Sequence, residues 1–269
     1  MPQTSTILSH LNTLFLAKDE PIFQLSGDFV VARLEGVELS SVFQPIVETR
    51  DNHIIGWEGL VRPSRLSDHA LLSPAEFFAL FESGPDLIRA DRICRALHLA
   101  NHLRSESQDG YLFLNLHPRH LLSVNGEFGR NFSQLVRILG MKPEQIVLEV
   151  LEHAIHDESL LQRAVHEFKH HGFLIALDDF EAQSDPLLVD RLFALKPHIV
   201  KFGRSFLQPR YQIILPKLFA AVRELGALAL SEGIETPEEK AHAAAAGAML
   251  MQGYLLGRPE VRNHLVVQP

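Results

Sequence analysis

The sequence has little cysteine, no cluster of basic residues and no long apolar run, and each shortage excludes a class of protein. Cys94 is the single cysteine among 269 residues, so no internal disulfide is possible and a reducing compartment is favoured. The 33 acids outnumber the 25 lysines and arginines and give a formal net charge of −8. Because phosphate contacts need a basic surface, a nucleic-acid polymer is not an expected partner.

Nothing in the sequence predicts an association with a membrane. No segment approaches the roughly 20 apolar residues that a membrane helix needs. The first 20 residues lack a basic leader and a small-residue cleavage pattern, so we expect no signal peptide. We therefore expect a cytoplasmic location.

What the chain does contain is a regular alternation of short apolar runs and longer amphipathic stretches. The apolar runs lie at 41–47, 53–61, 111–116, 145–151, 173–179, 198–202, 227–233 and 248–254. The helix-like stretches lie at 74–82, 85–106, 127–139, 157–171, 204–225 and 236–246. Strands that alternate with helices pair in parallel, and continuous apolar runs indicate strands that are buried on both faces.

This pattern predicts an α/β fold, a modified (βα)8 TIM-type barrel. The turn 48–52 joins the first two runs and leaves no room for a helix, so one strand should be antiparallel. Residues 39–269 should form the barrel domain and residues 1–38 a short N-terminal helical extension. The segment ILSHLNTLFLA in this extension is amphipathic enough to cover the barrel or to dock a protein partner.

Polar side chains stand at the ends of most of the apolar runs. Two adjacent acids, Asp178 and Asp179, end the run 173–179, although like charges repel. The other polar residues at run ends are Glu58, Asn115, Glu149, Glu152, Lys201, Glu232, Glu235 and Gln252. In a barrel of this type the C-terminal ends of the strands converge on the face that carries the chemistry. The sequence therefore predicts that several acids, an amide and a lysine meet in one mouth.

A cluster of acids in a barrel mouth indicates a metal site. Buried carboxylates cannot lie together unless protons or cations neutralise them. Carboxylate and amide oxygens are the ligands that Mg²⁺ and Mn²⁺ prefer. We expect a two-metal site in which Asp178 bridges the ions and Asp179 turns towards one of them. Two such ions would activate a water and stabilise a phosphoryl transition state.

Eight segments together resemble a known family. FQPIV, WEGLVRP, LFLNL, LEVLE, ALDDF, VK, SEGIET and QGYLLGRP are similar, in order and spacing, to the motif series of EAL domains across residues 39–260. The resemblance implies a modified barrel, often dimeric, with Mg²⁺ or Mn²⁺ in its mouth. It also implies an activity, the hydrolysis of cyclic di-GMP to the linear dinucleotide pGpG.

The resemblance implies roles for single residues as well. The metal ligands would be Glu58, Asn115, Glu149, Asp178, Asp179 and Glu232. The catalytic groups would be Glu58, Asp179, Glu232 and Lys201, with Lys201 orienting the attacking water. The substrate contacts would be Gln44, Arg62, Glu235 and Gln252, and an arginine can pair with a phosphate through its planar fork. Glu152 would steady the loop after Asp179.

The sequence departs from the family pattern at three places. Gly59 stands where alanine is usual, and we expect a mild effect because glycine keeps the small size. Gly203 stands where an aspartate is usual, which removes one acid from the mouth. The loop 180–186 lacks the family's glycines and carries two further acids, Glu181 and Asp185.

These departures leave alternatives to the enzyme open. One is a degenerate EAL domain that binds cyclic di-GMP or a protein partner without hydrolysis. Another is an interaction module that has lost its ligand. An unrelated metal-dependent barrel hydrolase is disfavoured by the order of the eight segments. A zinc site is disfavoured too, because His98 with His102, and His170 with His171, have no third ligand at a suitable spacing, so we interpret these histidines as packing or surface residues.

Overall fold

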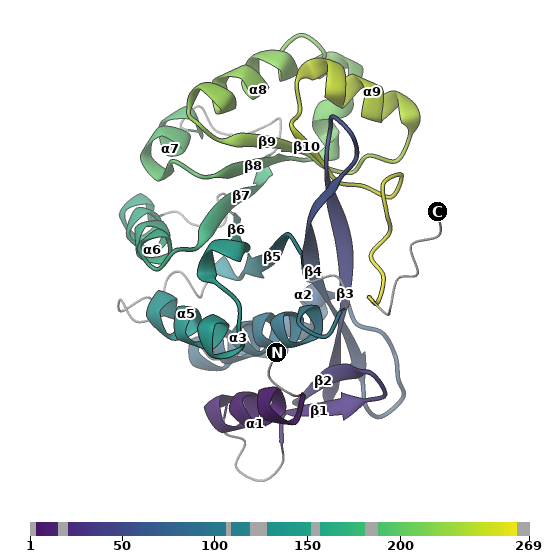
Figure 1. The fold of residues 1–269 in the computed structure, drawn as a ribbon, viewed down its shortest axis with the longest axis vertical. Coiled ribbons are helices and arrows are strands. Elements are labelled where there is room, and N and C mark those ends of the chain that lie inside the picture. The colour runs from purple at the N-terminus through teal and green to yellow at the C-terminus, as the bar shows by residue number, and fades with distance from the viewer. Residues whose placement is uncertain are drawn as a thin grey trace.

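A closed barrel of eight strands forms the centre of the protein (Figure 1). The computed structural model describes residues 4–15, 21–105, 109–118, 128–151, 157–180 and 188–262. The strands are β3 (Val37–Glu48), β4 (Ile54–Arg65), β5 (Tyr111–Leu116), β6 (Ile146–Leu151), β7 (Leu174–Phe180), β8 (Ile199–Phe202), β9 (Leu228–Ser231) and β10 (Leu250–Met251). Their order is β3-β10-β9-β8-β7-β6-β5-β4, and the pairing of β3 with β4 closes the barrel.

The prediction of a modified barrel with one antiparallel strand is confirmed. β3 runs antiparallel to both of its neighbours, β4 and β10. All the other neighbouring pairs in the barrel are parallel. Each predicted apolar run overlaps with one of these strands.

Helices cover the outside of the barrel, as Figure 1 shows. They are α2 (Pro74–Phe78), α3 (Gly84–His102), α5 (Phe128–Ile138), α6 (Glu158–His170), α7 (Leu188–Leu195), α8 (Leu215–Glu224) and α9 (Pro237–Ala246). Side chains cap several of their N-termini, as Thr236 does by accepting a hydrogen bond from the Glu239 backbone N–H. Among the described residues, no helix is long and apolar enough to span a bilayer.

Two helix predictions need correction. The stretch 204–225 is not one helix: two short 3₁₀ turns, Arg204–Leu207 and Pro209–Tyr211, precede α8. Pro209 and Pro216 explain the break, because a proline lacks the backbone N–H and is tolerated only in the first turn of a helix. The helix α7 was not predicted.

The N-terminal extension is only partly helical. The helix α1 (Thr4–Phe15) lies within it, but β1 (Phe23–Ser26) and β2 (Phe29–Leu34) form a hairpin that the sequence analysis missed. β2 then pairs antiparallel with β3, so the hairpin extends the sheet. Two tight turns, at Gly27 and at Glu35-Gly36, could have indicated these strands in the sequence. The φ angles there are positive, at 60°, 49° and 74°, which suits hairpin turns.

The barrel interior is layered, and the layers position the polar residues. One layer is apolar and consists of Ile46, Phe113, Val147, Ala176, Ile199, Leu230 and Leu250. Side chains alternate between the two faces of a strand, so the residue two positions away also points inwards. On β5 to β8 that residue is Asn115, Glu149, Asp178 or Lys201, and directly after β9 and β10 it is Glu232 or Gln252. An apolar layer therefore underlies a polar one.

The long helix α3 packs deeply against the barrel and carries buried polar groups. His98 is 4% exposed and His102 is 0% exposed, which confirms their interpretation as packing residues. Asn101 binds both backbone groups of Val30 on β2, at 2.9 Å and 2.8 Å. His102 Nδ1 lies 3.2 Å from Nη1 of Arg262, and that guanidinium stacks 4.0 Å from the centre of the Trp57 ring.

We expect the stability of the protein to fall in mild acid because of His102. Burial, and secondarily Arg262, lower the pKa of His102 from 6.5 to about 3. Below pH 6.5 the unfolded chain therefore takes up a proton that the folded chain refuses, and stability is lost as the pH falls. At pH 5 this amounts to roughly 2 kcal/mol.

Urea unfolding of the wild type and of His102→Leu at pH 7 and pH 5 tests this expectation. The loss of unfolding free energy between the two pH values should be smaller in the variant by roughly 2 kcal/mol. His166→Leu, which changes an exposed histidine on α6, is the control. Equal losses in all three proteins would show that His102 does not contribute.

Candidate active site

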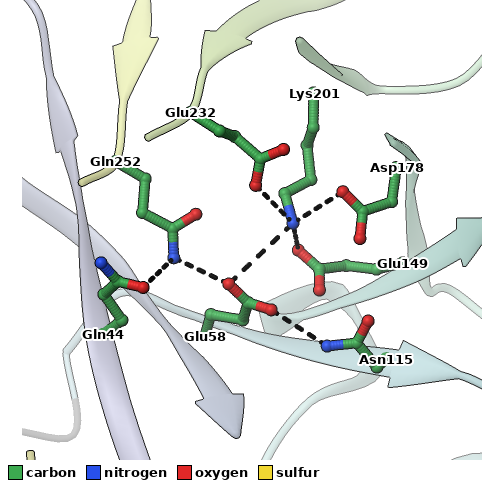
Figure 2. Close-up of polar contacts among 8 residues, drawn as sticks. All are labelled: Gln44, Glu58, Asn115, Glu149, Asp178, Lys201, Glu232 and Gln252. Carbon is green, nitrogen blue, oxygen red and sulfur yellow. Dashed lines mark hydrogen bonds and ion pairs between the residues drawn. The ribbon is translucent and has the colours of Figure 1, made fainter. Parts of the chain in front are cut away.

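The ammonium group of Lys201 lies at the centre of the polar layer (Figure 2). Its Nζ is 2.6 Å from Glu149 Oε1, 3.0 Å from Asp178 Oδ1 and 3.0 Å from Glu232 Oε1. Glu58 Oε2 is further away, at 4.0 Å. The lysine side chain is only 1% exposed. We call Lys201 and these four acids, which come from β4, β6, β7, β8 and the end of β9, the Lys201 cluster.

Side-chain amides hold the Glu58 carboxylate from both sides. Asn115 Nδ2 donates to Glu58 Oε1 at 3.0 Å, and Gln252 Nε2 donates to Glu58 Oε2 at 2.7 Å. Gln252 Nε2 also lies 3.4 Å from Gln44 Oε1, and Gln44 Nε2 donates to the Gly257 carbonyl at 3.1 Å. Figure 2 shows this chain of amides leading to Glu58. The amides fix the position of Glu58 without adding charge.

A bulge in β7 accounts for the two adjacent acids. Leu177 pairs with Val200 and Phe180 with Phe202, so two residues of β7 oppose one residue of β8. The two residues are Asp178 and Asp179, and the one opposite is Lys201. The bulge places Asp178 against the ammonium, while the side chain of Asp179 lies outside the described part of the chain.

The Lys201 cluster carries more negative than positive charge. Burial and the nearby Glu58 hold the pKa of Glu149 well above its usual range. Burial likewise raises the pKa of Glu232 to about 7. Burial works against the charge of Lys201, but the four acids outweigh it and raise its pKa. The pKa of Glu58 is lowered, because Lys201, Gln252 and Asn115 outweigh the effect of burial. Protons therefore balance part of the charge, and a cation could replace them.

The oxygen atoms of the Lys201 cluster and of the amides beside it are of the type that binds a hard divalent cation. Carboxylate and amide oxygens are its usual ligands. Glu149 Oε2 and Gln252 Oε1 are buried and accept no hydrogen bond from the residues that the structure describes. As arranged, however, no group of three acids or histidines in the described ranges is spaced to hold an ion, since Lys201 Nζ stands between the carboxylates. To hold a metal, the carboxylates would have to turn away from Lys201.

The structure brings most of the predicted site residues together, but not all of them. Arg62 is half-buried on β4, and its Nη1 donates to the Val61 carbonyl at 3.0 Å. Glu235 lies outside the cluster, where its Oε2 is 2.6 Å from Arg204 Nη1. Arg204 was not among the predicted site residues, because only the fold brings it near Glu235. Glu152 lies outside the described residues.

Comparison with known proteins identifies the family. The profile of the EAL domain matches residues 30–259. The chain belongs to the EAL domain family. The structure also resembles that of the Bacillus subtilis YkuI protein, which has an EAL domain and was solved with its substrate c-di-GMP and calcium. The TM-score is 0.72 at 26% identity, over 83% of this chain and 56% of YkuI.

Curated relatives of this EAL domain are cyclic di-GMP phosphodiesterases. RocR of Pseudomonas aeruginosa is 27% identical over 246 residues, which are 88% of this chain and 61% of RocR. PdeB of Escherichia coli, a probable cyclic di-GMP phosphodiesterase, is 26% identical over 84% of this chain and 43% of its own length. The chain thus spans less than two thirds of the length of these relatives.

The glycine of the EAL domain's naming motif, Gly59, contacts a histidine on α3. A Cβ atom at Gly59 would lie 2.9 Å from Cγ and 3.0 Å from Cβ of His98. The His98 ring is held in place, because its Nδ1 lies 2.8 Å from Ser41 Oγ. From the sequence we expected only a mild effect of this glycine, because it keeps the small size of alanine. The structure adds a second reason, since His98 occupies the space that a methyl group would need.

We expect Gly59→Ala to destabilise the protein by about 1–3 kcal/mol, because the new methyl group must displace either His98 or the strand that carries Glu58. Urea unfolding measures this loss. Gly203→Ala is the matched control, since a Cβ there meets nothing within 4 Å and the φ of −62° suits any residue. A Gly59→Ala variant as stable as the control would show that His98 can move aside without a loss of stability.

Proposed function

We propose that the chain is a metal-dependent phosphodiesterase that hydrolyses cyclic di-GMP to linear pGpG. The observation that supports this most is the Lys201 cluster, in which one buried ammonium faces four carboxylates at the C-terminal ends of barrel strands. This face carries the chemistry in barrels of this type. Membership of the EAL family and the similarity to RocR, a cyclic di-GMP phosphodiesterase, support cyclic di-GMP as the substrate.

The proposed cofactor is Mg²⁺ or Mn²⁺, two ions per site, held by Glu58, Asn115, Glu149, Asp178, Asp179 and Glu232. When bound, such ions stabilise the charge of a phosphodiester and lower the pKa of a water. The chain's own contribution is to present the oxygens. Asn115 and Gln252 fix the orientation of Glu58, whereas the carboxylates that contact Lys201 would have to turn towards the ions.

Lys201 acts in this proposal as a charged donor. The surrounding acids raise its pKa, so the ammonium keeps its proton at neutral pH. It therefore cannot take a proton from water, but it can orient a water and donate to a phosphoryl oxygen. Its burial keeps bulk water away and strengthens both interactions.

The substrate would lie above the Lys201 cluster. We assign contacts with it to Gln44, Gln252, Arg62 and Glu235, of which Gln44 and Gln252 already belong to the amide chain that holds Glu58. Glu152 is assigned to the support of the loop after Asp179. A homodimer, a protein partner and a cytoplasmic location stay predictions.

A degenerate EAL domain, which binds cyclic di-GMP without hydrolysis, is the second candidate. Gly203 favours it, because the family's usual aspartate is missing from the strand end next to Lys201. Open space surrounds the position that a Cβ would take there. The site has room for the acid but lacks it.

Turnover of cyclic di-GMP by the purified protein, with Mg²⁺ and with Mn²⁺, tests the proposal. We expect pGpG as the product, and a loss of at least about a hundredfold in Glu58→Gln and Glu232→Gln, which each remove one proposed ligand charge. Glu238→Gln, an exposed glutamate on α9, should retain the wild-type rate. No pGpG from the wild type, with cyclic di-GMP still bound in a titration, would leave the degenerate domain as the function.

The variant Gly203→Asp tests whether the missing aspartate limits metal binding at the site. An added carboxylate beside the cluster should lower the Mn²⁺ concentration needed for half-maximal turnover, because hard cations bind more tightly to more charged sites. Metal titrations of wild type, Gly203→Asp and Gly203→Asn measure this, with the asparagine as the uncharged control. Equal half-maximal concentrations would show that the acid is dispensable here.

A further inference from the structure

The short stretch between β9 and α9, which we call the 232–236 segment, carries two residues of the proposed site. Glu232 points into the Lys201 cluster, where its Oε1 lies 3.0 Å from Lys201 Nζ (Figure 2). Glu235 follows three residues later and is assigned to the substrate. Both residues lie outside the strands and helices that the structure describes. Their positions therefore depend on the contacts that the segment itself makes.

Backbone hydrogen bonds hold the first half of the 232–236 segment between two neighbouring strands. The Glu232 N–H donates to the carbonyl of Phe202, on β8, at 2.9 Å. The Ile234 N–H donates to the carbonyl of Gln252, directly after β10, at 3.0 Å. Gly233 stands between these two bonds with a φ of 69°, which glycine adopts without steric cost. The backbone is thus fixed at the start of the segment.

Arg204, in the 3₁₀ turn after β8, lies across the rest of the segment. Its aliphatic stem covers Gly233, since a Cβ atom on that glycine would lie 2.7 Å from Arg204 Cβ and 3.2 Å from Arg204 Cγ. Its guanidinium then reaches two acids. Arg204 Nη1 is 2.6 Å from Glu235 Oε2, while Nε and Nη2 are 3.0 Å and 2.9 Å from Glu239 Oε1. One side chain thus contacts the segment and the helix that follows it.

Glu239, in the first turn of α9, connects Arg204 to the backbone of the segment. Its Oε2 accepts hydrogen bonds from the N–H groups of Glu235, at 2.7 Å, and Thr236, at 3.1 Å. Its Oε1 faces Arg204, so the capping box of α9 and the ion pair share one carboxylate. An ion pair within such a network constrains its surroundings more than a lone surface pair does.

We propose that Arg204 is a positioning residue of the phosphodiesterase site. It acts through the 232–236 segment, by fixing the backbone from which Glu232 and Glu235 project. Glu232 has to turn away from Lys201 to meet an ion, and a fixed backbone confines that movement to the side chain. Fewer groups then lose freedom when an ion or the substrate binds. This inference rests on the proposed function, which assigns Glu232 to the metal and Glu235 to the substrate.

Calorimetric titration of the full chain with Mn²⁺ tests the proposal without any turnover. Arg204→Gln should raise the dissociation constant of Mn²⁺ by about threefold or more, because the backbone that carries Glu232 loses its support. Arg204→Lys keeps the charge but lacks the planar fork, so its dissociation constant should lie between the two. Arg210→Gln removes the same charge from an exposed arginine in the next 3₁₀ turn and should bind Mn²⁺ as the wild type does.

The variant Glu239→Gln shows whether Arg204 acts through the segment. Glutamine keeps an oxygen that accepts from the N–H groups of Glu235 and Thr236, but it loses the ion pair with Arg204. The double variant Arg204→Gln/Glu239→Gln should therefore weaken Mn²⁺ binding by less than the product of the two single effects. Single effects that simply multiply would overturn the proposed route through Glu239.

Amide hydrogen exchange separates a local effect from a general loss of structure. In Arg204→Gln the amides of residues 232–239 should exchange faster than in the wild type, while those of α3 and α6 should exchange at the same rate. Faster exchange throughout the chain would show a merely structural role for Arg204. Glu239→Gln takes the place of Arg204→Gln in both measurements if the latter does not fold.

The outcomes for this proposal and for the proposed function can be told apart. Equal Mn²⁺ affinity in the wild type and in folded Arg204→Gln overturns the positioning role, whether or not the protein forms pGpG. Weaker Mn²⁺ binding by Arg204→Gln, without pGpG from the wild type, supports the positioning role and overturns hydrolysis. A wild type that does not bind Mn²⁺ at millimolar concentration overturns both.

Discussion

The ion pairing of Lys201 is the interaction on which the centre of this barrel depends. Four carboxylates could not share a buried space without it, because each would be transferred from water with no compensating charge. One ammonium cannot balance four acids, and burial together with the neighbouring carboxylates raises the pKa values of Glu149 and Glu232. The barrel mouth therefore holds an excess of negative charge, which protons or a cation could balance.

The antiparallel strand β3 places a side-chain amide beside the acids of the site. It runs against its neighbours, and so it brings Gln44 opposite Glu58 at the seam where the barrel closes. Gln252, at the end of β10, completes the seam from the other side. Uncharged amides thus position the Glu58 carboxylate, whereas charged groups would have changed its pKa further. The antiparallel strand of the barrel therefore lies beside the carboxylate that two side-chain amides hold.

Much of this arrangement was predictable, because it depends on short-range patterns. Eight apolar runs predicted the barrel strands, and the alternation of side chains placed Glu149, Asp178 and Lys201 two residues after inward apolar ones. Two of the omissions have a common cause. The pairing of Arg204 with Glu235 and the contact of His98 with Gly59 depend on partners that are far apart in the sequence. The β1–β2 hairpin is different, because its strands are close in the sequence and its turn at Gly27 is a local signal that was overlooked. Asp179 and Glu152 stay predictions, since their side chains lie outside the described residues.

The helix α3 links the outer wall of the protein to its chemistry. Arg89, Arg92 and Arg95 of this helix line a cavity between α1, α3 and α5, and its last turns carry His98 and Asn101. His98 packs behind the strand of Glu58, and Asn101 joins Val30 to Ser41 through hydrogen bonds of 2.8 Å and 3.3 Å. Because a helix moves largely as one rigid body, a shift at one half is felt at the other. The effect of a substitution on α3 should therefore depend on which face and which half of the helix carries the residue. Its distance from Lys201 alone does not decide the effect.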